Sequence, residues 1–263
     1  MTVTRPLALI TGASSGIGYQ LAQQFTTHGY DVVLAAEDDG IVAAAAALAR
    51  DGASAEAVQV DLRNADGVAQ LYRMVTDSEQ PLAAAALNAG VGRGGKFIDT
   101  ELDDDFDIVD LNVRGTMQLA KLVLRDMARR NSGKVLFTSS IASTMPGSHQ
   151  PVYNASKSFI QSLAEAVHDE LRGTEVTVTS LMPGPTDTNF FHRAKMDDTV
   201  IGRMKFKDDP AEVARQGFEA LMRGDQKVVA ESMSTKAIGL ANRFLPDSVK
   251  AMANRVLSAP VPR

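Results

Sequence analysis

The fold of this chain is decided by residues 7–18, which read Leu7-Ala-Leu-Ile-Thr-Gly12-Ala-Ser-Ser-Gly16-Ile-Gly18. Residues 7–11 have β-strand character, and the segment 21–25 beyond the glycines is apolar in helical phase. A strand, a glycine turn and a helix in this order are the context in which a dinucleotide site is built. Glycines let the backbone approach a pyrophosphate, and the helix offers that anion unpaired N–H groups. Three glycines in an ordinary strand–helix turn are the alternative.

The rest of the chain continues the alternation of strands and helices, which predicts an α/β fold with a doubly wound parallel sheet and helices on both faces. With 263 residues, 44% of them hydrophobic, the chain can bury one substantial core, so we expect a single Rossmann-like domain over 1–263. Strands are expected near 7–11, 31–36, 55–60, 83–88, 133–139, 175–181 and 226–230. Helices are expected near 16–28, 40–51, 66–78, 103–129, 152–172, 210–223 and within 233–257.

Composition excludes several classes of function. A net charge of −5 argues against nucleic-acid binding, which needs a basic face. No segment is apolar enough to span a membrane, and the first strand begins too early for a signal peptide, so we expect a cytoplasmic protein. The chain has no cysteine, and its four histidines show no ligand spacing, so no metal is expected. The acidic run 101–107 fits a helix N-terminus better than a metal site.

Tyr153 and Lys157 are the most informative pair of polar residues. Four positions apart on a helix, they project from the same face. A free tyrosine has a pKa of about 10, and a neighbouring ammonium favours the phenolate, so we expect Lys157 to lower the pKa of Tyr153. Such tuning is what general acid–base catalysis needs. Ser140 lies thirteen residues before Tyr153 and completes a candidate catalytic set.

These features together resemble the short-chain dehydrogenase/reductase (SDR) family, in its compact single-domain branch. The resemblance runs from Leu7 to about Ala230. It implies an oxidoreductase that transfers a hydride between a nicotinamide cofactor and an alcohol or carbonyl substrate. The matching segments are Thr11-Gly-Ala-Ser-Ser-Gly-Ile-Gly18, Asp61-Leu62, Asn88-Ala-Gly90, Asn112, Ser140, Tyr153-x3-Lys157, and Pro183-Gly184 leading to Thr188.

The resemblance implies a role for each catalytic candidate. Tyr153 would donate a proton to the nascent alkoxide or accept one from the alcohol, and Lys157 would hydrogen-bond the nicotinamide ribose. Ser140 has the family's separation from Tyr153 and would polarise the carbonyl, whereas Ser139 is better explained as a hydroxyl that ties down a loop. Asn112 would hold a water in a proton relay; the alternative is a buried amide that satisfies backbone groups.

The resemblance also implies contacts with the cofactor. Asp61 would bind the adenine amino group with Leu62 against the ring, and Thr188 would reach the carboxamide. Leu87 departs from the family, which often has a second asparagine there. The alanine-rich segment 83–86 is a poor strand former, but it leads into Asn88, where the family has a strand. The full set of candidate contacts is Gly12, Ser14, Ser15, Gly16, Ile17, Gly18, Glu37, Asp61, Leu62, Asn88, Ala89, Gly90, Tyr153, Lys157, Pro183, Gly184 and Thr188.

The residues after the second strand address the choice of nicotinamide cofactor. A 2′-phosphate needs a cation, whereas a free ribose diol suits a carboxylate. The chain has Glu37-Asp38-Asp39 here, and neither Ser14 nor Ser15 is basic. We therefore expect a preference for NAD(H), without excluding NADP(H). The alternative is that these acids form a solvated turn.

The substrate is less defined. The family's variable substrate loop corresponds to residues 189–209, whose apolar side chains suggest a lid or ordinary packing. Its apolar residues are Phe190, Phe191, Met196, Ile201, Met204 and Phe206. Near Tyr153, the pocket is expected to be lined by Pro146, His149, Gln150 and Val152.

The C-terminal extension 232–263 carries five Lys/Arg against one Asp. An apolar helical stripe is expected from Val249, Met252, Ala253, Val256 and Leu257. It could pack on its own domain, form a subunit contact or lie on a membrane surface, of which the first two fit better. A homodimer or a homotetramer is therefore expected.

The sequence thus predicts an NAD(P)-dependent enzyme acting on a mostly apolar small-molecule alcohol or carbonyl. Two alternatives stay open. A nucleotide-sensing module would bind without turnover, and an epimerase or dehydratase would hold its NAD tightly.

Overall fold

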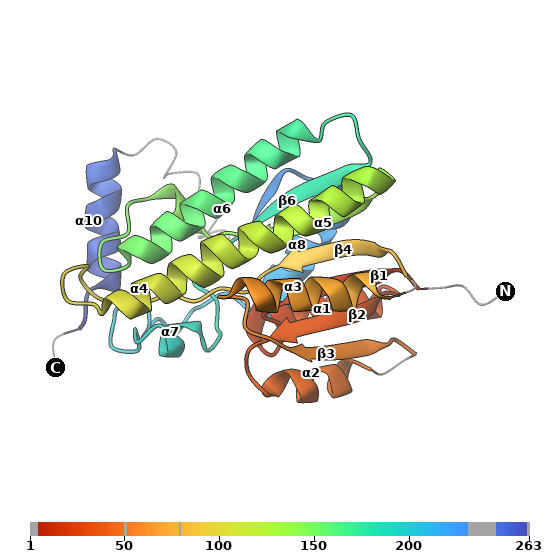
Figure 1. The fold of residues 1–263 in the computed structure, drawn as a ribbon. Helices are drawn as coiled ribbons and strands as arrows, with labels where there is room; N and C mark the ends of the chain where they lie inside the picture. Colours follow the sequence, from red (N-terminus) through yellow and green to blue (C-terminus); the bar gives the residue numbers. More distant parts are fainter. Residues whose placement is uncertain (1–4, 50–51, 79, 231–245, 262–263) are drawn as a thin grey trace.

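Within residues 5–49, 52–78, 80–230 and 246–261, which the computed structural model describes, seven parallel strands form one sheet in the order β3-β2-β1-β4-β5-β6-β7 (Figure 1). The predicted doubly wound sheet is confirmed. The strands are β1 (Leu7–Thr11), β2 (Asp31–Ala36), β3 (Ala55–Gln59), β4 (Leu82–Leu87), β5 (Gly133–Thr138), β6 (Val176–Pro183) and β7 (Lys227–Ala230).

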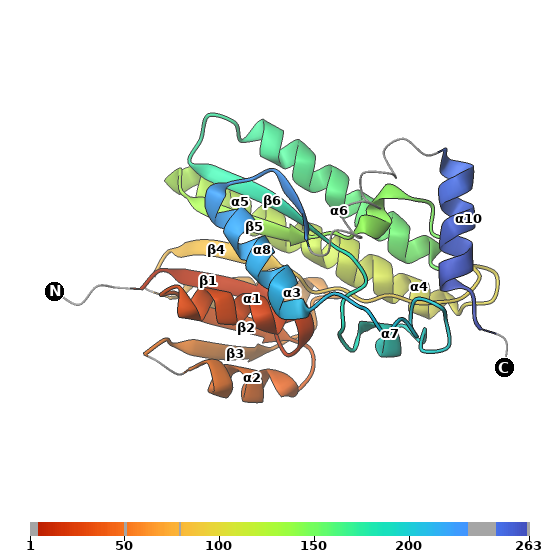
Figure 2. The ribbon, with the colours of Figure 1, turned by 180° about the vertical axis from the view of Figure 1, so that it is seen from behind.

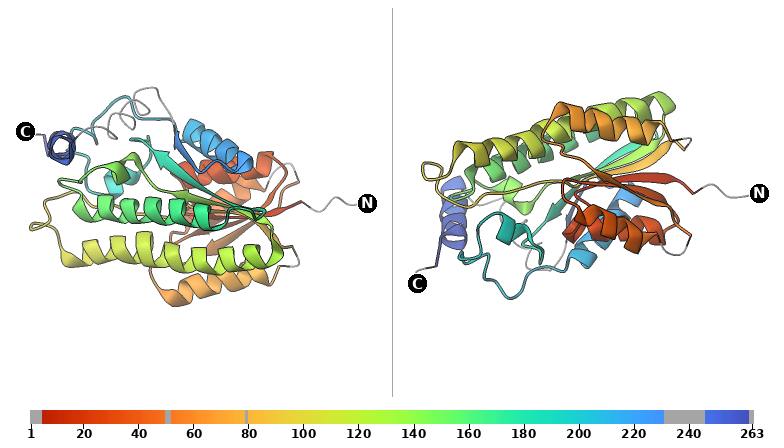
Figure 3. Two further views of the ribbon diagram at one scale, coloured as in Figure 1. Left: turned by 90° about the horizontal axis from the view of Figure 1, so that it is seen from above. Right: turned by 60° about the horizontal axis from the view of Figure 1, so that its bottom comes forward.

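Helices cover both faces of the sheet because successive strand residues point to opposite sides. In β1, Leu7 and Leu9 pack toward α3 (Ala65–Thr76), α5 (Thr116–Arg130) and α6 (Pro151–Glu170). Ala8 and Ile10 pack on the other face, toward α1 (Gly16–Thr27), α2 (Gly40–Leu48) and α8 (Pro210–Arg223). Figures 1 and 2 show one helical layer each, and Figure 3 shows the sheet between them.

The alanine-rich strand β4 lies in the middle of the sheet, hydrogen-bonded to β1 and β5. Its residues Ala84, Ala85 and Ala86 are fully buried between the two helical layers. Alanine is disfavoured in strands on average, but two paired neighbours and close helix packing outweigh that preference here. The predicted strand therefore forms, and it ends one residue before Asn88.

The helix predicted over 103–129 is built from three consecutive pieces. They are α4 (Leu102–Ile108), the π-helical turn η1 (Val109–Gly115) and α5. A π-helical turn places an extra residue in the helix and is often found at functional sites. Here it contains Asn112.

Two short elements were not predicted. A 3-10 turn, η2 (Ile141–Thr144), follows β5, and the short helix α7 (Phe190–Arg193) lies in the predicted lid. Both elements border the carboxyl ends of the strands, where the chain turns back toward a helix.

Part of the helix predicted within 233–257 falls in 231–245, outside the described residues. The described part is α10 (Asp247–Ser258), which lies across one end of the molecule (Figure 1). Its buried residues are polar: Ser258 accepts a hydrogen bond from Gln150 Nε2 (2.9 Å), and Asn254 Nδ2 donates to Ser148 O (2.9 Å).

The apolar stripe predicted on this helix faces solvent, with Val249 44%, Met252 59% and Val256 62% exposed. These three residues of the stripe thus do not pack on the described part of their own domain, whereas Leu257 lines the cleft described below. The side-chain hydrogen bonds of Asn254 and Ser258 join α10 to the rest of the chain, and most of its apolar stripe is left on the outside.

The order of the strands places a crevice at one edge of the sheet. The chain runs from β1 to β2 on one side and later to β4 on the other, so the crossovers diverge beside β1. Ligands of such sheets bind at the carboxyl ends of the strands beside this divergence. Among the described helices, none is long and apolar enough to cross a membrane.

Candidate active site

A cleft of about 340 Å³ opens at the carboxyl ends of the strands, within the usual range for a small-molecule site. Its walls come from the glycine turn, the strand ends, the lid and α10. Every residue predicted to contact the cofactor lines this one cleft, and so does Ser140. Asn112 is the predicted site residue that does not line it.

The glycine turn forms the floor at the nucleotide end. Gly12 has a φ of +66°, and a Cβ there would lie 2.9 Å from Ala89 Cα. At Gly18 a Cβ would lie 2.0 Å from Gly12 O. Both positions therefore require glycine, and the backbone at the start of α1 stays open to the cleft. Thr188 packs against this turn, with its Cγ2 3.0 Å from the position that a Cβ would take at Gly16.

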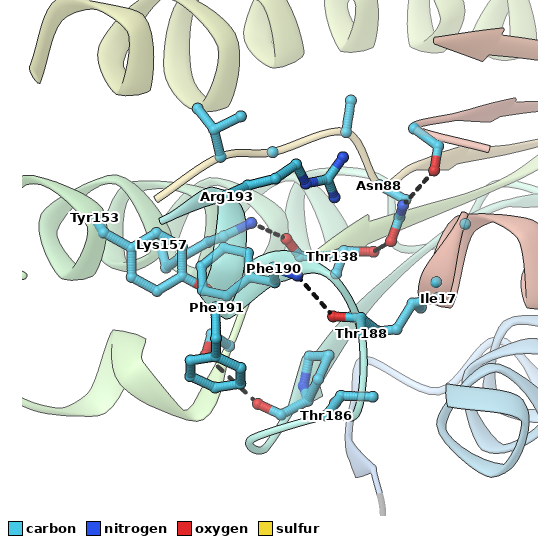
Figure 4. A pocket seen from close by; sticks show the side chains of 18 of the residues that line it. Ile17, Asn88, Thr138, Tyr153, Lys157, Thr186, Thr188, Phe190, Phe191 and Arg193 are labelled. Atoms are coloured by element: carbon cyan, nitrogen blue, oxygen red, sulfur yellow. Dashed lines mark hydrogen bonds between the residues drawn. The ribbon is translucent and has the colours of Figure 1, made fainter. Parts of the chain in front are cut away.

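Asn88 ties the ends of three central strands together (Figure 4). Its Nδ2 donates to Thr11 O (3.2 Å), and its Oδ1 accepts from Thr138 Oγ1 (3.1 Å). Thr11 Oγ1 in turn accepts from the backbone N–H groups of Asn88 and Ala89, both at 3.0 Å. Thr11 and Thr138 were not predicted as supporting residues, because a threonine at a strand end has no distinguishing local pattern.

Lys157 reaches the cleft from α6, with a side chain that is almost fully buried. Its Nζ donates to Thr138 O (2.9 Å) and lies 5.8 Å from the centroid of the Tyr153 ring. Ser139 Oγ donates to the carbonyl of Lys157 (3.1 Å), so this hydroxyl anchors the helix. Ser139 thus makes the structural contact expected of it.

Ser140 and Tyr153 meet at the other side of the same cleft. Ser140 caps η2 by accepting from Ala142 N (3.1 Å), and its hydroxyl donates to Pro183 O (3.5 Å) while lying close to the phenol of Tyr153. The Tyr153 ring also contacts Phe190 of the lid, with the centroids 5.2 Å apart. A proton donor and a second hydroxyl therefore converge where the apolar lid begins.

Burial controls the ionisation of this site. It raises the pKa of Tyr153 to about 12, an increase that the hydrogen bond from Ser140 offsets only in part. It also lowers the pKa of Lys157 to about 8. The prediction that Lys157 lowers the pKa of Tyr153 is wrong for this arrangement. The ammonium is hydrogen-bonded to Thr138 O and lies over the ring, so loss of hydration dominates.

Asn112 lies behind the cleft wall, 1% exposed. Its Oδ1 accepts from Val91 N (2.9 Å), and its Nδ2 donates to Val91 O (2.9 Å) and Ser156 Oγ (3.0 Å). The alternative weighed for this residue, a buried amide that satisfies backbone groups, describes these contacts. A Cβ at Gly90 would lie 3.2 Å from Asn112 Oδ1 and 3.1 Å from Lys157 Nζ. Glycine at this position therefore leaves room for both side chains beside the backbone.

The acids after β2 lie at the opposite end of the cleft, which both Glu37 and Asp38 line. Asp38 accepts from Ser14 Oγ (2.8 Å) and from Gly40 N (3.1 Å). Arg63, which was not predicted, forms ion pairs with Glu37 and Asp61. Glu37 and Asp38 are therefore held by specific contacts, and the turn is at the same time exposed to solvent, as the alternative interpretation expects.

The substrate end is mostly apolar. Of the predicted lid residues, Phe190, Phe191, Ile201 and Met204 line the cleft. Met196 is fully buried inside the lid, and Phe206 is 91% exposed, so neither forms the wall.

The wall near Tyr153 differs from the prediction. Gln150 lines the cleft, whereas Pro146, His149 and Val152 are not among its lining residues. Unpredicted residues also line this wall, among them Met145, Arg193, Asn254 and Leu257. Asn254 and Leu257 belong to α10, about a hundred residues from Tyr153, so no local sequence pattern connects them to the site.

The sequence profile of the short chain dehydrogenase family matches residues 6–199. Oxidoreductase UcpA of Salmonella typhimurium is 32% identical over 223 residues, which cover 83% of this chain and 81% of that protein. A 3-oxoacyl-(acyl-carrier-protein) reductase of Synechocystis is 32% identical over 184 residues, covering 69% and 74%.

Solved structures show the same fold. A short-chain dehydrogenase from Sphingobium yanoikuyae in complex with NADPH has a TM-score of 0.79 at 25% identity, over 90% of this chain and 93% of that one. A short-chain dehydrogenase/reductase from Burkholderia phymatum in complex with NAD has a TM-score of 0.82 at 22% identity, over 100% of both chains.

The chain belongs to the short-chain dehydrogenase/reductase family. The predicted family is thus confirmed, and with it an oxidoreductase that uses a nicotinamide cofactor. The interpretation as a sensing module without turnover is not favoured.

Proposed function

We propose that this chain is an NAD(H)-preferring oxidoreductase that interconverts an alcohol and a carbonyl on a mostly apolar substrate. The observation that carries the proposal is the convergence of Ser140 and Tyr153, with Lys157 beside the ring, in a cleft continuous with the glycine turn. A binding module has no need of this set of groups at the end of its nucleotide cleft.

The residues of the cleft fit a dinucleotide. Glycine is required at Gly12 and Gly18, where a side chain would collide with backbone, and the open backbone beside α1 suits a diphosphate. Gly184 and Thr188 line the same wall and would hold the nicotinamide end. When bound, the cofactor supplies the hydride, and the protein supplies position and proton transfer.

The raised pKa of Tyr153, about 12, keeps the phenol protonated at neutral pH. It is therefore set to donate its proton to the oxygen of a carbonyl substrate during reduction, while Ser140 holds that oxygen by a second hydrogen bond. Lys157 would hydrogen-bond the nicotinamide ribose. Asn112 would support Lys157 by holding the backbone at Val91.

The preference for NAD(H) rests on the charge at the adenosine end. Glu37, Asp38 and Asp61 all line the cleft there. A carboxylate accepts hydrogen bonds from ribose hydroxyls and repels a 2′-phosphate. The apolar character of the substrate rests on Phe190, Phe191 and other lid residues around Tyr153.

Substitution of the phenol tests the mechanism. Tyr153→Phe should lower the rate of NADH-dependent ketone reduction by roughly 100-fold or more, because general acid catalysis typically contributes that much. Its affinity for NADH should stay within about twofold. Tyr72→Phe on α3 makes the same change outside the cleft and should leave both unchanged. Normal turnover by the Tyr153 variant would contradict the proposed mechanism.

The proposed partner is a small-molecule alcohol or carbonyl. A homodimer or homotetramer and a cytoplasmic location remain predictions from the sequence. An epimerase or dehydratase would retain NAD through purification, which the absorbance of the purified protein detects.

A further inference from the structure

Arg63 lies between three carboxylates at the adenosine end of the cleft. Its Nε donates to both oxygens of Asp61, at 3.0 and 3.1 Å, and its backbone N–H donates to Asp61 Oδ1 (2.9 Å). Its Nη2 donates to Glu37 Oε2, and its Nη1 lies 3.6 Å from Asp107 Oδ2 on α4. Only the planar fork of arginine can address several carboxylates in this way.

Arg63 stands behind the acids that face the cofactor. Glu37 and Asp61 line the cleft, and Arg63 is not among its described lining residues. Burial would raise the pKa of Asp61, but the hydrogen bonds and the charge of Arg63 together lower it below its ordinary value. The hydrogen bond with Asp61 is the main cause of a raised pKa at Arg63. Asp61 and Arg63 are therefore both charged at neutral pH.

The sheet itself brings the two carboxylates together. Strands β2 and β3 are parallel neighbours, with Ala36 opposite Gln59, so the residues that follow them emerge at the same edge. Glu37 and Asp61 would repel each other there without a cation between them. The side chain of Glu37 is 46% exposed, so without Arg63 it would be free to turn into solvent.

The hydrogen bond from Arg63 also decides which oxygen of Glu37 is available. Nη2 occupies Oε2, and among the described residues no donor is bonded to Oε1. A carboxylate held through one oxygen presents the other in a defined direction. Such preorganisation adds to affinity because the side chain is not ordered at the moment of binding.

We propose that Arg63 is a positioning residue for the adenosine ribose, which holds Glu37 in the orientation that accepts the ribose hydroxyls. The inference rests on the proposed NAD(H) function. Arg63 acts through Glu37 and contributes affinity for NADH. Discrimination against NADPH stays with the carboxylate of Glu37, which remains when Arg63 is replaced.

A double-mutant cycle tests this coupling, with calorimetric titration of NADH and NADPH into the full-length protein. Arg63→Gln should weaken NADH binding about tenfold, the loss expected when one charge-assisted hydrogen bond becomes disordered. Glu37→Gln should weaken it similarly. The double variant should bind NADH less than about twofold more weakly than Glu37→Gln alone, because the residue through which Arg63 acts is already altered.

Two further variants keep the test decisive. Arg172→Gln removes an exposed arginine paired with Asp169 on α6 and should leave NADH affinity unchanged. Arg63→Lys keeps the charge without the fork and should give an intermediate loss. If Arg63→Gln does not fold, as judged by circular dichroism, the lysine variant takes its place in the cycle.

Three outcomes would overturn the inference. If Arg63→Gln weakens NADH binding equally in the unaltered protein and in the Glu37→Gln variant, the two residues act independently. A loss confined to NADPH would make Arg63 a ligand of the 2′-phosphate. Unchanged NADH affinity would leave Arg63 with a purely structural role. The proposed function fails separately, if the unaltered protein binds neither NADH nor NADPH.

Discussion

The two ends of the cleft are built in different ways. At the nucleotide end, hydrogen bonds and ion pairs fix short segments that directly follow strands, such as Gly12 after β1 and Asn88 after β4. At the substrate end, the wall is assembled from η2, the lid and α10, which are far apart in the sequence and mostly apolar at the cleft. The first end is specified by local geometry, whereas the second is specified by which distant segments pack together.

The largest effect is expected from Gly18→Ala, which attacks the nucleotide end directly. The added Cβ would lie 2.0 Å from Gly12 O, and the backbone of the turn must move to accommodate it. We expect roughly 100-fold weaker NADH binding and a loss of about 1–3 kcal/mol in unfolding free energy. Titration of NADH and thermal unfolding measure these changes.

Gly29→Ala is the matched control, since this glycine has a φ of +86° but open space around its Cβ position. It should cost about 1 kcal/mol of stability and leave NADH affinity unchanged. Equal affinities for NADH in the two variants would show that the turn does not set the nucleotide site.

The next largest effect is expected from the charge of Lys157, which lies between the nucleotide end and the substrate end of the cleft. Burial gives Lys157 a pKa of about 8, so its charge is present below that pH and lost above it. The rate of carbonyl reduction should therefore fall about tenfold per pH unit above pH 8 if the ammonium is required. Rates measured from pH 6 to 10 provide the profile. The pH profile of Lys157→Arg, which stays charged, should show no fall in rate starting near pH 8, whatever the absolute rate of this variant. If the fall near pH 8 persists, a group other than Lys157 causes it.

A smaller effect is expected at the substrate end. Ser258→Ala removes the acceptor of Gln150 Nε2, which leaves a buried amide without its partner. The unfolding free energy should fall by about 1–3 kcal/mol, and KM for ketones should rise while NADH affinity is unchanged. A parallel loss of NADH affinity would mean that the two ends are not independent.

The smallest effect is expected from Phe206→Ser. This ring is 91% exposed and does not line the cleft. Stability should change by less than about 0.5 kcal/mol, and KM should stay constant. A clear rise in KM for apolar ketones would place Phe206 in the lid wall during turnover.

The same contrast explains what could be predicted from the sequence. The sheet, the glycine turn and the cleft-lining residues from Gly12 to Thr188 could be predicted because most of them lie in short motifs at strand ends. The partner of the apolar stripe on α10 could not be predicted, because an apolar period does not say whether a helix packs on its own domain or on another surface, and here Asn254 and Ser258 make the buried contacts. The ion pairs of Arg63 and the shifted pKa values of Tyr153 and Lys157 depend on three-dimensional neighbours and burial, which spacing does not encode.

The position of α10 has a consequence for the order in which the protein acquires its parts during synthesis. Leu257 of this helix accepts a hydrogen bond from Ile201 N of the lid (2.9 Å), and Val261, just beyond the helix, donates from its N–H to Asp198 O (2.8 Å). The helix comes after every other segment that lines the cleft. A chain emerging from the ribosome therefore completes its nucleotide-binding surface first and gains the far wall of its substrate pocket only at the last helix.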